Sequence, residues 1–282
     1  MRSITHLLDE AYYYLPDPVG QAIKPLCPHG AALRRQLYAM APQYTVETEW
    51  GVRMRVDPSN YVERTLADGR FERKFLQYVN NRLDEWNHFV DIGANIGFFS
   101  LFVGNRNNDC RVDAFEPAPH NLTRLIENVR LNPAALNING YAVGDYNGEI
   151  NLQVSRRHPG ETTVAGTPKS ESETETVITT VRRLDDCLDE HPDVIKLDIE
   201  GAEVAALRGA NSVLSETPEL LLELHPSNIQ ELGEDQTEVV DTLSDHGYTN
   251  AVRIEDGSDL PLSRLGNTTR EHTHYHITRR CS

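Results

Sequence analysis

A glycine-rich segment followed, one strand later, by a carboxylate is the strongest chemical signal in the sequence. The run from Asp91 through Gly93 and Asn95 to Gly97 sits where an apolar strand pattern changes to a helical one. Small residues at such a turn let the backbone approach a ligand, and the start of the helix offers free N–H groups. Glu116 ends the next predicted strand, where a carboxylate can accept hydrogen bonds from both hydroxyls of a ribose. The pattern therefore predicts a nucleoside-containing cofactor.

Two kinds of cofactor share this pattern. A nicotinamide site usually shows G-x-G-x-x-G because the pyrophosphate needs the third glycine. Here the run is G-x-N-x-G, and the sequence has no Tyr-x-x-x-Lys pair for hydride transfer. S-adenosylmethionine contains a ribose and an adenine but no phosphate, so it fits better. A nicotinamide oxidoreductase remains the weaker alternative.

A second signal is a set of charges at the end of a predicted buried strand. Lys196, Asp198 and Glu200 alternate in the segment DVIKLDIEGAE, so an extended chain places them on one side. Buried parallel strands normally read as continuous apolar runs, and ligands bind at their carboxyl ends. We therefore expect these three residues at the reacting end of a ligand. For Lys196, a structural ion pair with a carboxylate is the alternative, because burying an unpaired ammonium is costly.

The elements that must position these residues alternate along the chain. From residue 88 onwards, apolar runs of strand length are separated by segments with helical spacing, which predicts a mainly parallel sheet covered by helices. Two late strands without a helix between them predict an antiparallel end. The strands are expected within residues 88–92, 111–117, 137–145, 149–155, 175–184, 193–201, 218–226, 249–254 and 272–280, and the helices within 88–104, 119–132, 201–214 and 227–246.

The first part of the chain is organised differently. Residues 1–45 contain five prolines and predict a helical extension, and residues 46–56 alternate about a glycine, as in a hairpin. We assign residues 46–282 to one catalytic domain, and we expect a helix within residues 69–83. The polar segment 156–175 has no apolar periodicity and predicts a loop, either a mobile lid or an ordinary solvent loop.

The sequence resembles the FkbM family of S-adenosylmethionine-dependent methyltransferases. The resemblance rests on FVDIGANIGFFS, AFEP, AVGD, IKLDIEGAE and LLLELH, in this order, and covers about residues 53–248. It implies a seven-stranded Rossmann-like sheet whose last strand is antiparallel, and transfer of a methyl group, most often to oxygen. By position, it implies that Asp91, Gly93, Asn95 and Gly97 frame the methionine part of the cofactor and that Glu116 binds the ribose. It also implies that Val143, Gly144 and Asp145 lie at the adenine end.

The chemistry of methyl transfer to an oxygen suggests the catalytic residues. The enzyme must align the acceptor behind the sulfonium methyl and remove a proton as the bond forms. Candidate bases are Asp198, Glu200 and His225, with Lys196 beside them. Asp198 is favoured to orient or deprotonate the acceptor, and holding the ammonium end of the cofactor is its alternative role. His225 titrates near neutrality if it is unperturbed, although a capping or solvated histidine is an equal alternative.

The sequence does not predict a metal. Asp198, Glu223 or His225 could serve as ligands for Mg²⁺, but the spacing along the chain indicates no third ligand. His272, His274 and His276 alternate near the C-terminal end, and such pairs can bind zinc only with a further partner. If this strand is antiparallel, His272 lies at the cofactor edge of the sheet and His276 does not.

Composition limits the partners and the location. The chain has 282 residues, with 27 Lys and Arg against 43 Asp and Glu, a net charge of −16, and only four lysines. Such an acidic balance argues against a nucleic-acid partner and is typical of a salt-rich cytoplasm or of an ordinary acidic enzyme. No apolar run approaches the roughly 20 residues of a membrane span. We expect a cytoplasmic O-methyltransferase that acts on a small molecule or glycan, with a non-catalytic cofactor-binding protein as the alternative.

Overall fold

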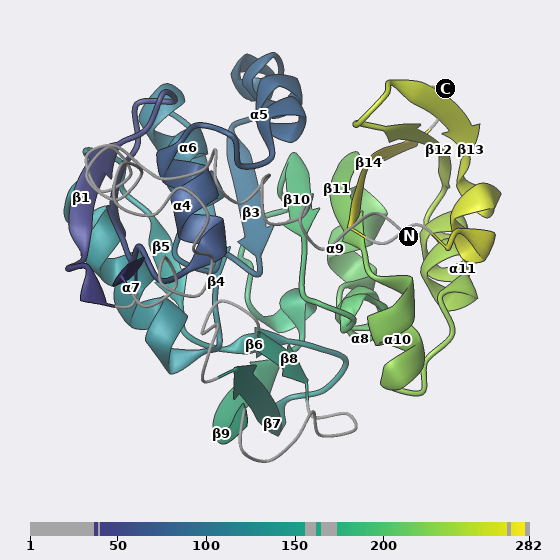
Figure 1. Ribbon diagram of the computed structural model, residues 1–282. Helices are drawn as coiled ribbons and strands as arrows, with labels where there is room; N and C mark the ends of the chain where they lie inside the picture. The colour runs from purple at the N-terminus through teal and green to yellow at the C-terminus, as the bar shows by residue number, and fades with distance from the viewer. Residues whose placement is uncertain (1–36, 39, 156–161, 165–173, 270–271, 280–282) are drawn as a thin grey trace, which may run out of the picture. The chain divides into compact units, whose positions relative to one another are not determined.

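The computed structural model describes residues 37, 38, 40–155, 162–164, 174–269 and 272–279 (Figure 1). Residues 1–36 and 39 of the predicted extension, and most of the predicted lid, lie outside these residues. By its contacts, the chain divides into two compact units, residues 1–73 and 74–282. The predicted hairpin falls in the first of these units, and a domain boundary after residue 45 stays a prediction.

The first unit contains the hairpin that the alternating pattern predicts. Strands β1 (Tyr44–Glu47) and β2 (Arg53–Val56) pair antiparallel, with Val46 opposite Met54. Helix α4 (Tyr61–Ala67) follows, and the side chain of Asn60 caps it by accepting a hydrogen bond from the backbone N–H of Glu63. Such a cap satisfies one of the free N–H groups at a helix start.

The second unit is built on a mixed sheet. Among the described residues it has eight strands in the order β13-β12-β14-β11-β10-β3-β4-β5. Neighbours from β11 to β5 pair parallel, and β14 pairs antiparallel with both β11 and β12. The strands are β3 (His88–Ile92), β4 (Arg111–Phe115), β5 (Asn137–Asn139), β10 (Val194–Leu197), β11 (Glu219–Leu224), β12 (Tyr248–Arg253), β13 (Ser258–Pro261) and β14 (Thr273–Arg279).

This arrangement confirms the predicted Rossmann-like α/β fold with an antiparallel last strand. The expected seven strands are joined by an eighth, β13, which pairs with β12 at the sheet edge. Its segment is short and polar and carries no strand pattern that we could predict. The segment 137–145 holds two short strands instead of one, because β6 (Ala142–Val143) leaves the main sheet.

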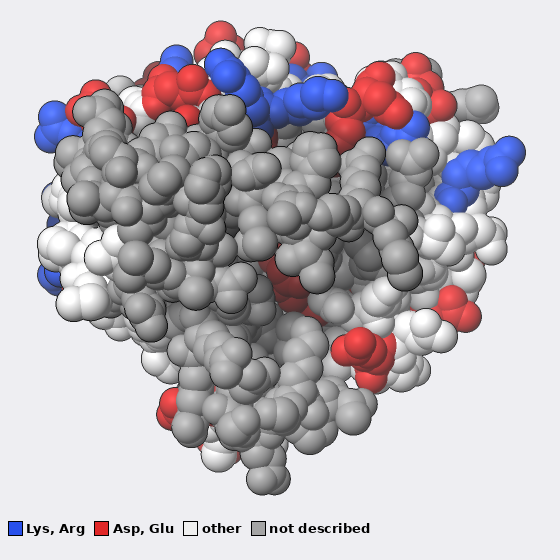
Figure 2. All heavy atoms as spheres, viewed as in Figure 1, with Lys and Arg blue, Asp and Glu red and all other residues white. Residues whose placement is uncertain are grey.

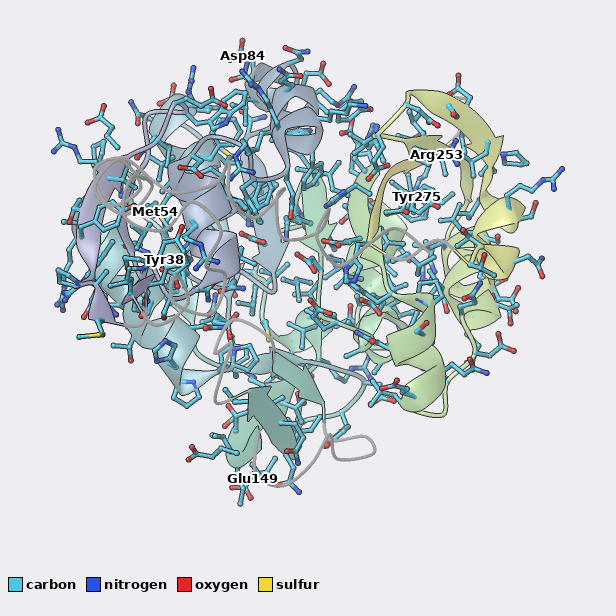
Figure 3. The ribbon with its side chains drawn as sticks, viewed as in Figure 1. Tyr38, Met54, Asp84, Glu149, Arg253 and Tyr275 are labelled. Carbon is cyan, nitrogen blue, oxygen red and sulfur yellow. The ribbon has the colours of Figure 1, made fainter. Side chains whose placement is uncertain are left out.

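A second, four-stranded sheet has the order β6-β9-β7-β8. It contains β7 (Gly148–Ser155), β8 (Thr162–Val164) and β9 (Thr174–Arg182), and β7 pairs antiparallel with both β8 and β9. The pair flanking the polar segment is therefore present as predicted, with one short strand inside that segment. On β7, Glu149 points to solvent, whereas Tyr275 on β14 lies in the core of the main sheet (Figure 3).

Helices connect the strands. They are α5 (Arg73–Asn80), α6 (Phe98–Arg106), α7 (Pro119–Val129), α8 (Glu203–Arg208), α9 (Asn211–Glu216), α10 (Pro226–Glu231) and α11 (Thr237–Asp245), with 3-10 turns η2 (Leu83–Glu85), η3 (Leu184–Asp186) and η4 (Leu262–Asn267). None of the described helices has the length and apolarity needed to cross a membrane. On the face shown in Figure 2, side chains of both signs lie over α5, and acidic side chains are visible over α10.

Each of the last two predicted helices is two shorter ones. The segment 201–214 breaks at Gly209, where a Cβ atom would lie 1.8 Å from the carbonyl oxygen of Gly144. The segment 227–246 breaks around Gly233, which has a φ of +80°. In both cases a glycine conformation or a close backbone approach interrupts a pattern that looks continuous in apolar spacing.

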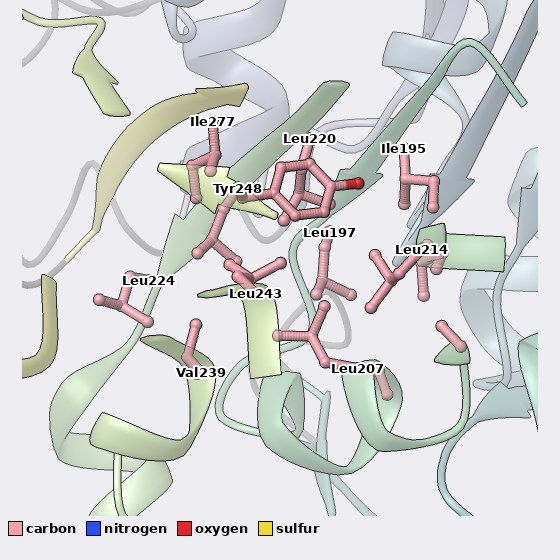
Figure 4. Packing of buried hydrophobic residues seen from close by; sticks show 14 of the residues in the cluster. Ile195, Leu197, Leu207, Leu214, Leu220, Leu224, Val239, Leu243, Tyr248 and Ile277 are labelled. Atoms are coloured by element: carbon pink, nitrogen blue, oxygen red, sulfur yellow. The ribbon is translucent and has the colours of Figure 1, made fainter. Parts of the chain in front are cut away.

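A core of buried, mostly aliphatic side chains packs strands of the main sheet, among them β10, β11, β12 and β14, against α8, α9 and α11 (Figure 4). Leu197, Leu220 and Leu243 are almost entirely buried there. The Tyr248 hydroxyl donates a 2.7 Å hydrogen bond to the Thr217 carbonyl, so its one polar atom is satisfied. This packing fixes the ends of β10 and β11, where the predicted reactive residues lie.

Candidate active site

The glycine turn joins β3 to α6 and is held by backbone contacts to both neighbouring strands. Gly93 has a φ of +88°, and a Cβ atom there would lie 1.8 Å from the carbonyl oxygen of Asp198. The N–H groups of Gly93 and Ala94 both donate to the Phe115 carbonyl at 3.0 Å. Gly97 also has a positive φ, and a Cβ there would meet Leu125 at 2.6 Å. The turn therefore needs glycine at both positions, Gly93 for the backbone approach and Gly97 for packing.

A pocket of about 290 Å³ opens beside this turn, between the carboxyl ends of β3, β4 and β10 and the small sheet. Of the predicted cofactor residues, Gly93, Asn95, Glu116, Val143, Gly144 and Asp145 line it, and of the predicted catalytic residues, Asp198 and Glu200 do. The other four predicted residues, Asp91, Gly97, Lys196 and His225, lie outside this lining. The side chains of Lys196 and His225 contact the lining residues Asp198 and Glu200. Asp91 and Gly97 lie within two residues of the lining residues Ile92 and Asn95 in the chain.

Glu116 is buried in the pocket wall and braces the glycine turn. Its two carboxylate oxygens accept hydrogen bonds from the backbone N–H groups of Asn95 and Ala118, each at 2.8 Å. The amide of Asn121 lies 3.4 Å from one of these oxygens. Burial raises the pKa of Glu116 to about 7, and the hydrogen bonds only partly oppose this effect. The group thus changes charge within the physiological range.

Asp91, Lys196 and Asp198 form a chain of charges beneath the pocket floor. The Lys196 ammonium lies 3.1 Å from an Asp198 oxygen and 3.5 Å from an Asp91 oxygen, and its side chain is 4% exposed. The Ser100 hydroxyl donates to the second Asp91 oxygen at 2.6 Å. Lys196 therefore has the carboxylate partners that the sequence requires, and one of them, Asp198, lines the pocket.

The opposite end of the pocket combines predicted and unpredicted residues. Val143, Gly144 and Asp145 line it together with Tyr141, and Asp145 lies 4.0 Å from Arg208. The rest of the wall, most of it aromatic or aliphatic, carries no signal in the sequence, because its residues come from separate strands, helices and turns that only the fold brings together. The lining residues without a prediction are Ile92, Phe115, Pro117, Asn121, Tyr141, Ala142, Tyr146, Ile150, Leu152, Val181, Ile199, Gly201, Ala202, Ala205, Leu232 and Glu234. An apolar wall suits the flat faces of an adenine ring.

Glu200 links the pocket to a buried histidine. It has a φ of +54°, unusual for a residue other than glycine, and its carboxylate accepts a 3.1 Å hydrogen bond from the Asn228 amide. The Nε2 atom of His225 lies 3.7 Å from Glu200, and its Nδ1 atom lies 2.9 Å from the buried carboxylate of Glu203. Burial raises the pKa of Glu200, and the neighbouring charges of Asp198 and Glu223 raise it further. Such a carboxylate accepts a proton more readily than an exposed one.

His225 differs electrostatically from the neutral base that the sequence suggests. Burial would lower the pKa of His225, but the carboxylates of Glu203, 2.9 Å from Nδ1, and of Glu223, 3.5 Å from Nε2, outweigh burial and raise the pKa to about 11. His225 is therefore protonated at neutral pH. The cause is a carboxylate from α8, which spacing along the chain does not reveal.

The three C-terminal histidines have different surroundings. His274 lies 3.3 Å from Glu223 and stacks on Phe75, and His276 bonds to the Tyr78 hydroxyl at 2.6 Å. His272 precedes β14, is largely exposed and lies 3.4 Å from Glu223. The structure thus places His272 at the carboxyl end of β11, as the antiparallel prediction requires.

Comparisons with known proteins agree with this geometry. A family model described as the methyltransferase FkbM domain matches residues 91–249. Hexuronic acid methyltransferase AglP of Haloferax volcanii is 26% identical over 207 residues, which cover 72% of this chain and 80% of that protein. Methyltransferase 1 of Beauveria bassiana is 30% identical over 141 residues, covering 43% of this chain and 57% of that protein.

One solved structure from this family is also similar to the chain. The structure of a methyltransferase FkbM from Methylobacillus flagellatus has a TM-score of 0.44 at 17% identity, covering 96% of this chain and 57% of that chain. This chain thus spans little more than half the length of that protein and of the Beauveria relative. The family model matches more than half of the residues, with the glycine turn, Glu116 and the charged end of β10 inside the match, and this chain therefore belongs to the FkbM family of methyltransferases.

Proposed function

We propose that this methyltransferase binds S-adenosylmethionine in the pocket beside the glycine turn and transfers its methyl group to a hydroxyl oxygen of a sugar. Glu116 would accept hydrogen bonds from the ribose, and the wall around Tyr141 and Val143 would hold the adenine. The methionine end would then lie toward Gly93 and the end of β10. This orientation places the sulfonium beside Asp198 and Glu200.

One observation carries the proposal: two carboxylates line the pocket at the end of β10, each with a different partner. Asp198 is held by the Lys196 ammonium at 3.1 Å, which suits a fixed acceptor that orients a hydroxyl. Glu200 has the raised pKa that suits proton removal, and His225 and Asn228 hold its carboxylate in place. We therefore assign acceptor orientation to Asp198 and proton removal to Glu200, with Lys196 as a positioning residue.

The charge of the pocket favours a hydroxyl over a carboxylate as the reacting oxygen. Asp198 and Glu200 both belong to the lining at the end of β10, and they would repel an anionic acceptor group placed between them. The named activity of the Haloferax relative supports a sugar acid as the acceptor, which offers both kinds of oxygen. A hydroxyl gives a methyl ether and a carboxylate gives a methyl ester, so the product distinguishes the two.

The test uses the full chain and S-adenosylmethionine with a deuterated methyl group. Hexuronic acid glycosides and matched neutral hexose glycosides are incubated with the enzyme, and products are followed by mass spectrometry before and after mild alkali. We expect a labelled product that survives alkali, as an ether does. A label that alkali removes would assign the reaction to the carboxylate, and binding of NAD in place of S-adenosylhomocysteine in calorimetry would overturn the cofactor. A cytoplasmic location remains a prediction from the sequence.

A further inference from the structure

A cluster of histidine and glutamate side chains lies at the end of β11, outside the pocket lining. Glu223 ends this strand, His225 follows it, and His272 comes from the chain just before β14. One oxygen of Glu223 lies 3.5 Å from Nε2 of His225 and 3.4 Å from Nδ1 of His272. The three ligand atoms are all within 4.8 Å of one another, and Glu200 approaches His225 from the pocket side at 3.7 Å.

The sheet register brings these residues together. Strands β11 and β14 pair antiparallel, with Glu223 opposite His274 and Leu224 opposite Thr273. The residue before Thr273 therefore meets the residue after Leu224, and the rings of His225 and His272 lie edge to face at 5.1 Å. His272 has a φ of +50°, which turns the chain at this point. The third partner that sequence spacing lacks is thus supplied by a residue 47 positions further on.

His225 has the orientation of a metal-ligating histidine. Its side chain is 1% exposed, its Nδ1 atom is engaged by the buried carboxylate of Glu203 at 2.9 Å, and its Nε2 atom is buried without a hydrogen-bond partner. A carboxylate on one ring nitrogen fixes the tautomer that presents the lone pair of the other nitrogen to a metal. Here that second nitrogen faces Glu223.

The ligand spacing suits a tetrahedral ion. Nitrogen and carboxylate ligands bind Zn²⁺ at about 2.0–2.2 Å, which places neighbouring ligand atoms about 3.3–3.6 Å apart in a tetrahedron. The distances from Glu223 to His225 and to His272, 3.5 Å and 3.4 Å, fall in this range. Two imidazoles and one carboxylate suit zinc and similar ions, whereas Mg²⁺ prefers oxygen ligands alone.

We propose that Glu223, His225 and His272 bind a divalent transition-metal ion of the zinc type, with Glu203 as the positioning carboxylate behind His225. The fourth position faces Glu200 and the pocket, and is open to water or an anionic group of the acceptor. A cation there would offset the negative charge that Asp198 and Glu200 place at this end of the pocket. This site goes beyond the proposed reaction, and metal binding is measured without any turnover.

The test titrates chelator-treated full-length protein with Co²⁺, a probe whose visible absorption reports tetrahedral nitrogen and oxygen ligands, and then displaces it with Zn²⁺. We expect one equivalent per chain, and at least a tenfold loss of affinity in His272→Ala and in Glu223→Gln. His272 is largely exposed, so its loss leaves the fold intact. His191→Gln is the matched control, because His191 is exposed and lies before the amino end of β10. Glu203→Gln is expected to weaken binding about 10- to 100-fold.

The outcomes separate this site from the proposed function. Unchanged Co²⁺ affinity in His272→Ala and Glu223→Gln, or a thermal shift with Mg²⁺ alone, overturns the metal site. Calorimetry with S-adenosylhomocysteine on the same variants measures the affinity of the cofactor pocket independently of the metal. We expect His272→Ala to bind S-adenosylhomocysteine with unchanged affinity, so loss of the metal with retained cofactor binding supports two separate sites. A protein that binds neither ion while retaining methyl transfer leaves the proposed function standing and removes the metal site.

Discussion

The backbones at Gly93 and Asp198 approach each other so closely that the Cα of Gly93 faces the carbonyl oxygen of Asp198, with no space for a side chain on Gly93. A Cβ atom on Gly93 would lie 1.8 Å from that oxygen, which belongs to the backbone and cannot turn aside. The contact joins the ends of β3 and β10 at the wall of the pocket, where the glycine turn meets the carboxylates of Asp198 and Glu200.

We predict that Gly93→Ala abolishes measurable S-adenosylhomocysteine binding in calorimetry, because β3 and β10 must separate to admit the methyl group. The control is Gly247→Ala, since Gly247 has a similar φ of +83° but no atom within 4 Å of its would-be Cβ. The control should lose about 1–2 kcal/mol of unfolding free energy from backbone strain alone. Equal losses of stability and of cofactor affinity in the two variants would contradict the role of the close contact.

We predict that cofactor affinity depends on pH through Glu116. Its pKa is raised to about 7 by burial, so its contribution to the stability of the cofactor-free protein is fully present below about pH 4.5 and is lost as pH rises through 7. Ribose hydroxyls donate best to the ionised carboxylate, so S-adenosylhomocysteine should bind more tightly as pH rises from 6 to 8. Calorimetry across this range checks the trend.

Glu116→Gln is the companion measurement. The variant keeps the size of the side chain but replaces one acceptor oxygen with an NH₂ group facing a backbone N–H. We expect roughly a 10- to 100-fold weaker affinity from the loss of a charge-assisted contact, and a flat dependence on pH. A slope that persists in the variant would assign the titration to another group.

Much of the fold can be predicted from the local pattern of apolar residues. The features that cannot be predicted depend on contacts between segments far apart in the chain. The runs around Val90 and Ile195 are mainly apolar, and both form central strands that are buried on both faces. Gly209 interrupts a helix because the Gly144 carbonyl lies against it, a contact between segments far apart in the chain. Periodicity reports which residues face a core, but it does not report where two backbones cross.

The candidate site shows the same division. Glu116, Asp198 and Glu200 end predicted strands, so their place at the pocket follows from parallel pairing. The sequence predicts that His225 titrates near neutrality. Its surroundings depend on Glu203, which begins α8 after the turn that follows β10 and lies 2.9 Å from Nδ1 of His225. The meeting of His225 and His272 depends on the antiparallel register of β11 and β14, which no single segment specifies.

We predict that Leu220→Ala destabilises the protein by about 2–5 kcal/mol, because Leu220 is fully buried in the central sheet and the change leaves a cavity. The control is Ile178→Ala on β9, where the side chain is 66% exposed and the loss should stay within about 1 kcal/mol. Urea unfolding measures both. Similar midpoints for the two variants would show that the core tolerates the cavity by collapsing.

The last prediction separates Asp198 from Glu200. If Asp198 orients the acceptor and Glu200 removes the proton, both Asp198→Asn and Glu200→Gln should lower turnover by about 10²–10⁴ while S-adenosylhomocysteine affinity hardly changes. Their pH profiles should differ. Activity of the parent enzyme should rise with pH through the raised pKa of Glu200, because only the ionised carboxylate accepts a proton.

This rising limb should persist in Asp198→Asn and vanish in Glu200→Gln. The charged groups facing Glu200 are Asp198, Glu223, His225 and His272, and removing the negative charge of Asp198 should move the limb to lower pH, since that charge helps to raise the pKa of Glu200. Single-turnover rates at saturating cofactor and acceptor, measured from pH 5 to 9, check both statements. A limb that is lost in Asp198→Asn and kept in Glu200→Gln would exchange the two roles, and full turnover in both variants would remove the pair from the chemistry.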